Sequence, residues 1–271
     1  MSLLAGFRHR PLLARMAGFR HRRLLARMAG PRLLRAFAGS YPAARFVEIG
    51  ANDGHQHDHL RPFVTSLDWT GVMVEPVPYV FERLRANYAG VAGVALERAA
   101  IAESDGTRPL HHLAEVPAPE ARGLPSWYDG IGSFSRDALL SHAPEIPDVE
   151  DRMVTTEVAC LTFESLCAKH GLDRIDLLAV DTEGYDWGVL RTVDFAARRP
   201  RLVVYEHYHL SAADRGACAD HLRGHGYELL AEGFDTFALR TGEDDALERT
   251  WRRLKPAVAA ASKEADLRAG R

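Results

Sequence analysis

A short glycine-rich stretch with two carboxylates, EIGANDG, begins at Glu48 and directly follows an apolar pair. Glycines spaced this closely after a strand let the backbone approach a ligand. A dinucleotide fingerprint needs glycine at its third and sixth positions, which counted from Gly50 are Asn52 and His55. Glu48 and Asp53 would also place negative charge beside phosphate groups, which is electrostatically unfavourable. The loop therefore disfavours a nucleotide phosphate and favours a ligand that carries positive charge.

A further carboxylate ends the next apolar run, GVMVEP, where Glu75 comes 21 residues after Gly54. An acid at this position can accept hydrogen bonds from the ribose hydroxyls of an adenosine. Alone it could be a strand-end acid facing water, but with the acidic loop it predicts S-adenosylmethionine, which has a cationic sulfonium and no phosphate. We expect the adenosine between the first three strands. The predicted cofactor contacts are Glu48, Gly50, Asn52, Asp53, Gly54, Glu75, Pro76, Ala100, Ile101 and Asp181.

Short apolar runs alternate with stretches of helical composition from Arg45 onward. The predicted strands are 45–50, 71–76, 94–102, 175–181, 201–207, 227–232 and 234–240. The predicted helices are 57–67, 78–89, 162–170, 185–197 and 211–224. This alternation predicts an α/β fold with a mostly parallel sheet covered by helices on both faces. Only Gly233 separates the last two strands, which is too short for a crossover, so the last strand should pair antiparallel.

The predicted domain covers residues 45–240 and contains one long connection at 103–153. This connection holds six prolines and the pair Trp127-Tyr128, and we expect it to form a lid. Residues 241–271 form a charged helical tail, in which Leu247, Trp251 and Leu254 should pack against the domain.

A basic helical extension, residues 1–44, precedes this domain and contains a 12-residue repeat: AGFRHRPLLARMA is followed by AGFRHRRLLARMA. Residues 1–47 hold ten arginines and no acid, which leaves 24 basic against 37 acidic residues, a charge of −13, for the remainder. A 12-residue step rotates a helix by roughly 120°, so the two Leu-Leu pairs lie on different faces. Tandem duplication explains this pattern better than a docking face, although contact with a membrane surface or nucleic acid is a further interpretation.

The three cysteines, Cys160, Cys167 and Cys218, show neither disulfide nor metal-site spacing. We interpret them as reduced thiols of a cytoplasmic protein. No apolar run approaches the ~20 residues that a membrane-spanning helix needs.

Two separated stretches resemble the FkbM family of S-adenosylmethionine-dependent methyltransferases. The first comprises EIGANDG, WTGVMVEPVP from Trp69, Arg83-Leu84 and Asn87-Tyr88; the second is LTFESLCAKHGLDRIDLLAVDTEGYDWGVL from Leu161. The resemblance covers about 45–240 and implies the class I, Rossmann-like fold, with seven strands of which the last is antiparallel. Known members mostly methylate hydroxyls of sugars or natural products, so it implies an O-methyltransferase of natural-product biosynthesis. HQHDH at 55–59 is richer in histidine than the family pattern.

Methyl transfer requires the acceptor atom, the methyl carbon and the sulfur in line at ~3 Å contact, followed by loss of a proton. Ligands of such sheets gather at the carboxyl ends of the parallel strands. Asp181 and His207 are therefore the principal candidates for the base, and Glu183 and Glu206 complete the predicted catalytic set, with His209 nearby. The alternative to a catalytic role is a structural one, in which Asp181 or Glu183 caps the following helix and His207 packs against a loop.

A divalent metal held by Asp181, Glu206 and His207 is a further alternative, because these side chains suit magnesium-like or transition ions. We assign no metal ligands on this basis, and we interpret the histidines of 55–59 as solvated. Gly132, Ser133 and Phe134 of the long connection could cover the cofactor or the acceptor.

The expected substrate is a small hydroxylated molecule. N- or carboxyl-methylation of a peptide or metabolite is a second hypothesis, because the cofactor half does not distinguish acceptors. A nucleic-acid-associated methyltransferase or binding module, recruited through the basic arm, is a third, which the acidic remainder disfavours. A homo-oligomer is left open.

Overall fold

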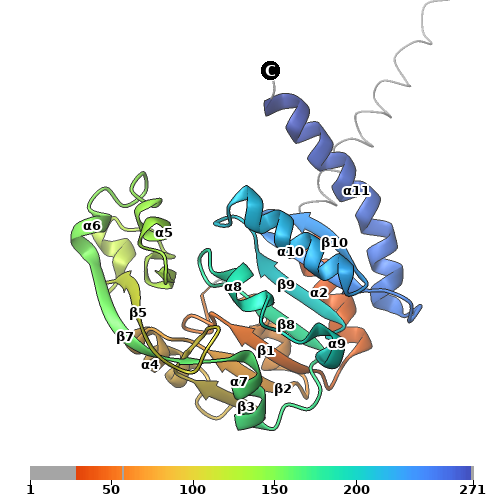
Figure 1. Ribbon diagram of the computed structural model, residues 1–271, viewed down its shortest axis with the longest axis horizontal. Helices are drawn as coiled ribbons and strands as arrows, with labels where there is room; N and C mark the ends of the chain where they lie inside the picture. Colours follow the sequence, from red (N-terminus) through yellow and green to blue (C-terminus); the bar gives the residue numbers. More distant parts are fainter. Residues whose placement is uncertain (1–28, 57, 270–271) are drawn as a thin grey trace, which may run out of the picture.

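The structure is a computed structural model that describes residues 29–56 and 58–269. Its centre is a seven-stranded sheet with the order β10-β11-β9-β8-β1-β2-β3 (Figure 1). The strands are β1 (Arg45–Ile49), β2 (Thr70–Val74), β3 (Val94–Glu97), β8 (Leu177–Val180), β9 (Leu202–Glu206), β10 (Tyr227–Glu232) and β11 (Asp235–Arg240). All neighbouring pairs from β3 to β9 are parallel, and β11 runs antiparallel between β9 and β10. The predicted fold class and the antiparallel last strand are therefore confirmed.

Helices cover both faces of this sheet because side chains alternate along each buried strand. In β1, Phe46 faces one core and Val47 the other. Helices near the first core are α2 (Ala29–Ser40), α3 (Arg61–Val64), α4 (Pro78–Asn87) and α11 (Ala246–Ala269). Those near the second are α7 (Phe163–His170), α8 (Asp186–Leu190), α9 (Phe195–Arg198) and α10 (Ala212–Gly224).

Helix α2 belongs to the packed domain, although the sequence placed it in the basic extension. Leu33 and Phe37 are fully buried, one helical turn apart, and pack in the same core as Trp251 of α11. Leu247, Trp251 and Leu254 are buried as expected. The 12-residue repeat lies outside the described residues, apart from its final Ala29.

The long connection, together with residues on both sides of it, forms a second, four-stranded sheet with the order β4-β7-β5-β6. Its strands are β4 (Ala100–Ile101), β5 (Gly106–Leu113), β6 (Gly132–Ser133) and β7 (Met153–Leu161). It also carries η1 (Pro119–Arg122), η2 (Tyr128–Gly130), α5 (Arg136–Leu140) and α6 (Val149–Arg152). The single strand expected over 94–102 is two strands, because the chain leaves β3 after Glu97 and pairs with β7 from Ala100.

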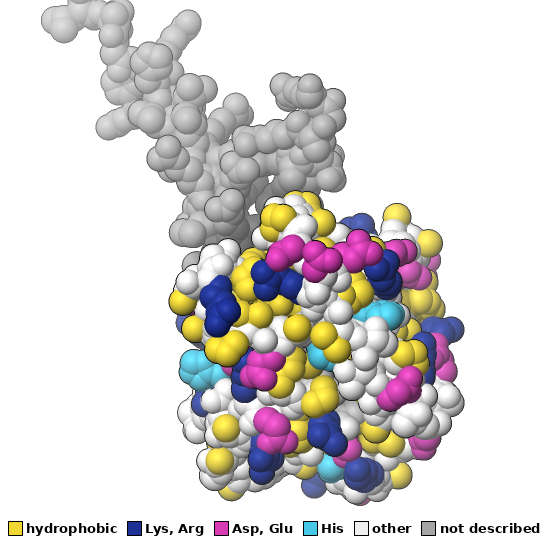
Figure 2. All heavy atoms as spheres, turned by 90° about the vertical axis from the view of Figure 1, so that its left-hand side faces the viewer, with side chains coloured by type: hydrophobic (Ala, Val, Ile, Leu, Met, Phe, Trp, Pro, Cys, Tyr) yellow, Lys and Arg dark blue, Asp and Glu magenta, His cyan; other side chains and the backbone are white. Residues whose placement is uncertain are grey.

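This second unit has its own small core, built around Tyr128, Leu139 and Ile146. We call it the insert, and its α5 faces the carboxyl ends of β8 and β9 (Figure 1). The face seen in Figure 2 carries basic and acidic side chains side by side rather than gathered into one basic patch. Among the described residues, no helix combines the length and the apolar character needed to cross a bilayer.

Candidate active site

A cavity of about 1270 Å³ lies between the insert and the carboxyl ends of the central strands. At one end of it, β1 leads into a tight turn at Gly50, whose φ is +82°. A Cβ on Gly50 would lie 1.6 Å from the carbonyl oxygen of Asp181, so only glycine fits between these neighbouring strands. The N–H groups of Gly50 and Ala51 both donate to the Val74 carbonyl, at 2.9 and 3.0 Å, which fixes the loop on β2.

Glu75 follows β2 and is only 6% exposed. Its two carboxylate oxygens accept the backbone N–H of Val77 at 2.8 Å and that of Asn52 at 3.1 Å. Burial raises the pKa of Glu75 to about 7, although these two hydrogen bonds oppose the shift. Each carboxylate oxygen has a second lone pair, so Glu75 can still accept two hydroxyl groups from the cavity side.

The structure sorts the ten predicted cofactor residues into three groups. The residues that line the large cavity are Gly50, Asn52, Glu75, Pro76, Ala100, Ile101 and Asp181. Glu48 lines a smaller adjoining cavity of about 130 Å³, and its Oε2 has no hydrogen-bond partner in the described part of the chain. Asp53 and Gly54 line neither cavity. Asp53 accepts the N–H groups of His55 and Gln56 at 2.8 Å each, so it shapes the turn.

Four acidic side chains gather where β8 and β9 end. Asp181 and Glu183 follow β8, Asp186 begins α8, and Glu206 ends β9. The surrounding protein and the charges of Glu183 and Glu206 raise the pKa of Asp181 well above its ordinary value. Burial, followed by the charge of Glu206, raises the pKa of Glu183 to about 7. The region is therefore short of positive charge.

The alternative role of Asp181 or Glu183 as a helix cap is not what the structure shows. The residue that precedes α8 makes no side-chain capping bond. Asp186 instead accepts the Thr182 hydroxyl at 3.0 Å and the Glu206 N–H at 3.2 Å, and so joins the two strand ends. Glu183 has a φ of +51°, an unusual conformation for a residue other than glycine.

His209 is the histidine that the structure brings to these acids. Its Nδ1 lies 2.9 Å from Glu206 Oε2 and 3.0 Å from Glu183 Oε2. Burial lowers the pKa of His209, but the hydrogen bond to Glu206 and the charge of Glu183 outweigh burial, so its pKa is raised. Glu183, Glu206 and His209, the acid–imidazole cluster, line the cavity together with Asp181.

His207 does not lie with this cluster. Its Nδ1 is 3.0 Å from the Thr236 hydroxyl, and it is not among the cavity-lining residues. Glu206 ends β9 and faces the cavity, whereas the His207 side chain beyond the strand end turns toward Thr236 of β11. The structure therefore assembles neither the expected pair of Asp181 with His207 nor the alternative metal trio of Asp181, Glu206 and His207.

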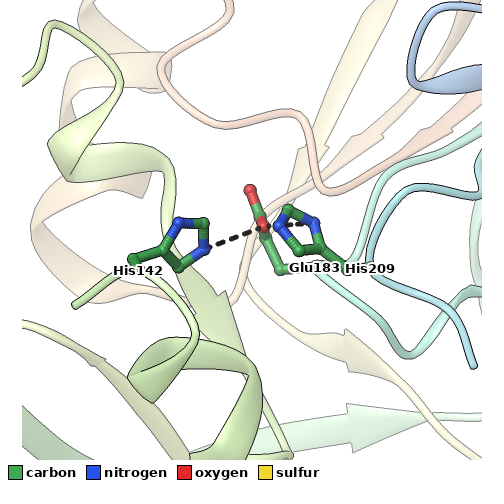
Figure 3. Close-up of side chains that lie close together, drawn as sticks. All are labelled: His142, Glu183 and His209. Atoms are coloured by element: carbon green, nitrogen blue, oxygen red, sulfur yellow. Dashed lines mark ion pairs between the residues drawn. The ribbon is translucent and has the colours of Figure 1, made fainter. Parts of the chain in front are cut away.

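The insert supplies the opposite wall of the cavity, including Gly132, Ser133 and Phe134. The Ser133 hydroxyl donates to the Glu183 carbonyl at 2.9 Å, which ties the insert to the loop after β8. His142, which follows α5, also lies here, with its Nε2 3.9 Å from Glu183 Oε2 (Figure 3). Sequence reasoning missed His142, since no local pattern marks it.

Two exposed aromatic rings, those of Tyr208 and Phe234, also line the cavity and are 57% and 61% exposed. Their centroids are 4.6 Å apart. Trp127 of the insert lines the cavity as well. Large exposed apolar side chains in a cavity are suited to a ligand with apolar faces.

The sequence of this chain is similar to that of a known protein family and of two characterised proteins. Residues 48–229 match the family model of the methyltransferase FkbM domain. The chain is 27% identical over 205 residues to 31-O-demethyl-FK506 methyltransferase FkbM of Streptomyces tacrolimicus, covering 70% of this chain and 75% of that protein. It is 35% identical over 139 residues to the AMB antimetabolite synthetase AmbE of Pseudomonas aeruginosa, covering 45% of this chain and 6% of that protein.

Among solved structures, methyltransferase FkbM from Methylobacillus flagellatus KT is similar, with 11% identity and a TM-score of 0.46. That similarity covers 73% of this chain and 44% of the other.

Proposed function

This chain belongs to the FkbM family of S-adenosylmethionine-dependent methyltransferases, and we propose that it methylates a hydroxyl group of a sugar or another small natural product. The observation that carries this proposal is the acid–imidazole cluster of Glu183, Glu206 and His209 in the wall of the cavity. A hydroxyl is a weak nucleophile and must lose its proton during methylation. A half-buried cluster of proton-accepting groups beside the cofactor residues meets that requirement.

The residues present fit the cofactor. Glu75 lines the cavity, and each of its carboxylate oxygens accepts one backbone N–H, so each keeps capacity to accept a ribose hydroxyl. The turn at Gly50 and Asn52 exposes backbone to the same space. When bound, S-adenosylmethionine supplies an electrophilic methyl group on a positively charged sulfur. Asp181 and Glu183 lie on the same side of the cavity, and a cationic ligand beside them would favour their ionised forms.

The acid–imidazole cluster can orient and deprotonate an acceptor. Glu206 holds the His209 imidazole through Nδ1, and a carboxylate in this position fixes the orientation of the ring. Glu183, with a pKa of about 7, changes protonation state near neutral pH, where a base is most effective. A hydroxyl held against this cluster would lose its proton to it while its oxygen takes the methyl carbon and the carbon–sulfur bond breaks, leaving S-adenosylhomocysteine.

The size and lining of the cavity support an acceptor of substantial size. Ligand pockets commonly measure about 300–1,000 Å³, so a cavity of about 1270 Å³ has room for the cofactor and a second molecule. Tyr208, Phe234 and Trp127 offer aromatic faces to that molecule. The name of the Streptomyces tacrolimicus relative describes methylation of 31-O-demethyl-FK506, an oxygen acceptor. This likeness supports an oxygen acceptor for the present chain.

The test is a screen with S-adenosylmethionine that carries a labelled methyl group. Hydroxylated sugars and natural products are each paired with the analogue that lacks one hydroxyl. We expect label in a hydroxylated compound and none in its deoxy partner. Equal labelling of both partners, or label found only in amines or carboxylic acids, would overturn the proposal.

A further inference from the structure

Three potential metal ligands from distant parts of the chain meet beside the cavity. His142 follows α5 of the insert, Glu183 lies between β8 and α8, and His209 lies between β9 and α10. One ligand atom from each residue lies within 4.8 Å of the other two. Figure 3 shows the Glu183 carboxylate between the two imidazole rings.

Two of these ligand atoms lack a hydrogen bond. His142 Nε2 and Glu183 Oε2 are both buried and form no hydrogen bond with a described residue, although Glu183 Oε2 also lies within ion-pair distance of His209 Nδ1, at 3.0 Å. A buried polar atom without a partner is energetically unfavourable, so such atoms in folded proteins usually have one. Both atoms face the same small space, with Oε2 3.9 Å from His142 Nε2 and 3.0 Å from His209 Nδ1. A cation at this point would satisfy both of them.

The charge of the cavity favours a cation as well. Its described lining has seven carboxyl side chains and no lysine or arginine; the seven are Glu75, Asp137, Glu145, Asp181, Glu183, Glu206 and Asp235. Bound S-adenosylmethionine brings one sulfonium and one ammonium against its own carboxylate, a net charge of about +1. A second cation in the cavity would favour the ionised forms of the remaining carboxyl groups.

We propose that His142, Glu183 and His209 bind one divalent transition-metal ion, with Zn²⁺ as the best match. Two imidazole nitrogens and one carboxylate oxygen suit zinc and related ions, whereas magnesium prefers oxygen ligands throughout. Zinc–nitrogen bonds of 2.0–2.1 Å put tetrahedral ligand atoms about 3.3 Å apart. In the present structure Glu183 Oε2 lies 3.0 Å from His209 Nδ1 and 3.9 Å from His142 Nε2, so metal binding requires the insert histidine to move inward.

The ion would join the insert to the central domain, because His142 is the only one of its three ligands in the insert. A metal on His209 Nδ1 would take the place of the proton that Nδ1 shares with Glu206, so the Glu206 carboxylate would be released to accept the proton of an acceptor hydroxyl. Metal binding itself does not depend on which atom of the acceptor is methylated. The site is therefore testable without knowledge of the substrate.

The experiment uses the full chain, treated with chelator and dialysed, and titrates it with Zn²⁺ by calorimetry and with Co²⁺ by visible absorption. We expect one ion per chain at this site and a Co²⁺ spectrum of a four-coordinate nitrogen–oxygen site. His142→Ala and His209→Ala should each weaken binding by more than 100-fold, since even indirect partners of a metal contribute 10- to 100-fold. His111→Ala is the matched control, because His111 lies on β5 of the insert and its ring contacts Thr155 instead.

Several outcomes would overturn the site. These are no ion bound, binding that both histidine variants retain, or an equal loss in the His111→Ala control. If a thermal melt shows that His142→Ala does not fold, His142→Gln replaces it, because glutamine keeps about the same side-chain volume. If neither variant folds, the Co²⁺ spectrum of the parent protein decides whether the site binds metal. A chain that binds no metal but still methylates hydroxyls would refute this site and leave the proposed function standing.

Discussion

Replacing Glu75 with glutamine should weaken cofactor binding without disturbing the fold. In the parent, each carboxylate oxygen of Glu75 accepts one backbone N–H and keeps a second lone pair to offer a ribose hydroxyl. Glutamine keeps the size but removes the charge and one acceptor oxygen. Loss of charge-assisted hydrogen bonds costs roughly 1–3 kcal/mol of binding free energy, which corresponds to about a 5- to 150-fold larger dissociation constant.

The pH dependence of binding should identify the same group. Glu75 has a pKa of about 7 in the free protein, and only its ionised form can accept both hydroxyls. Affinity should therefore fall as pH decreases through 7, approaching tenfold per unit below it. Glutamine does not titrate, so the variant should lose this part of the slope.

The assay is calorimetric titration with S-adenosylhomocysteine, which carries the same adenosine but no sulfonium, between pH 6 and pH 8.5. The matched control is Glu97→Gln, the same change at the end of the neighbouring strand β3. The Glu97 carboxylate contacts Lys169 and His170 and lies outside the cavity lining. Unchanged affinity in folded Glu75→Gln, or an equal loss in both variants, would refute the assignment of Glu75 to the cofactor.

Further predictions concern the cluster, the loop and the tail. In the labelled-methyl assay, His209→Ala should lower turnover by about 10²–10⁴-fold, whereas turnover of His207→Ala should stay within about threefold of the parent. A larger loss in His207→Ala than in His209→Ala would show that the base does not belong to the acid–imidazole cluster. Gly50→Ala should destabilise the protein by more than about 2 kcal/mol in denaturant titration, whereas Gly90→Ala, which also has positive φ but open space around it, should cost only about 1–2 kcal/mol. Equal costs would show that the close contact is unimportant. Glu248 is buried, which would raise its pKa, but the N–H groups of 242–244 and Arg252 lower it to about 2. Its stabilising contribution should be complete above about pH 5 and disappear as pH falls toward 2, so thermal melts of parent and Glu248→Gln should converge there.

The central sheet could be predicted from the sequence because its signals are local. Apolar runs such as IDLLAV alternate with helical stretches, and Gly233 leaves no room for a crossover before the last strand. The second sheet was missed because β5 contains Pro109, which weakens a strand pattern, and because its partner β7 lies 40 residues or more away. Long-range pairing of this kind leaves little local trace.

The site was predictable in part for a similar reason. Glu75 and Asp181 end buried strands, so their positions follow from the topology rule alone. The choice between His207 and His209 depended on the path of the chain after β9 ends at Glu206, which carries His207 to Thr236 and His209 back to Glu206. His142 could not be found, because its position depends on how the whole insert folds around Tyr128 and Leu139.

The measurement that most directly tests hydroxyl methylation is identification of the bond that the transferred carbon forms. The full chain is incubated with S-adenosylmethionine labelled with ¹³C in its methyl group and with an acceptor from the screen, and the purified product is examined by proton–carbon NMR. We predict that the labelled carbon is the methyl of an ether, O–CH₃, at the position of the former hydroxyl. Label in an N-methyl group or a methyl ester would contradict the proposal.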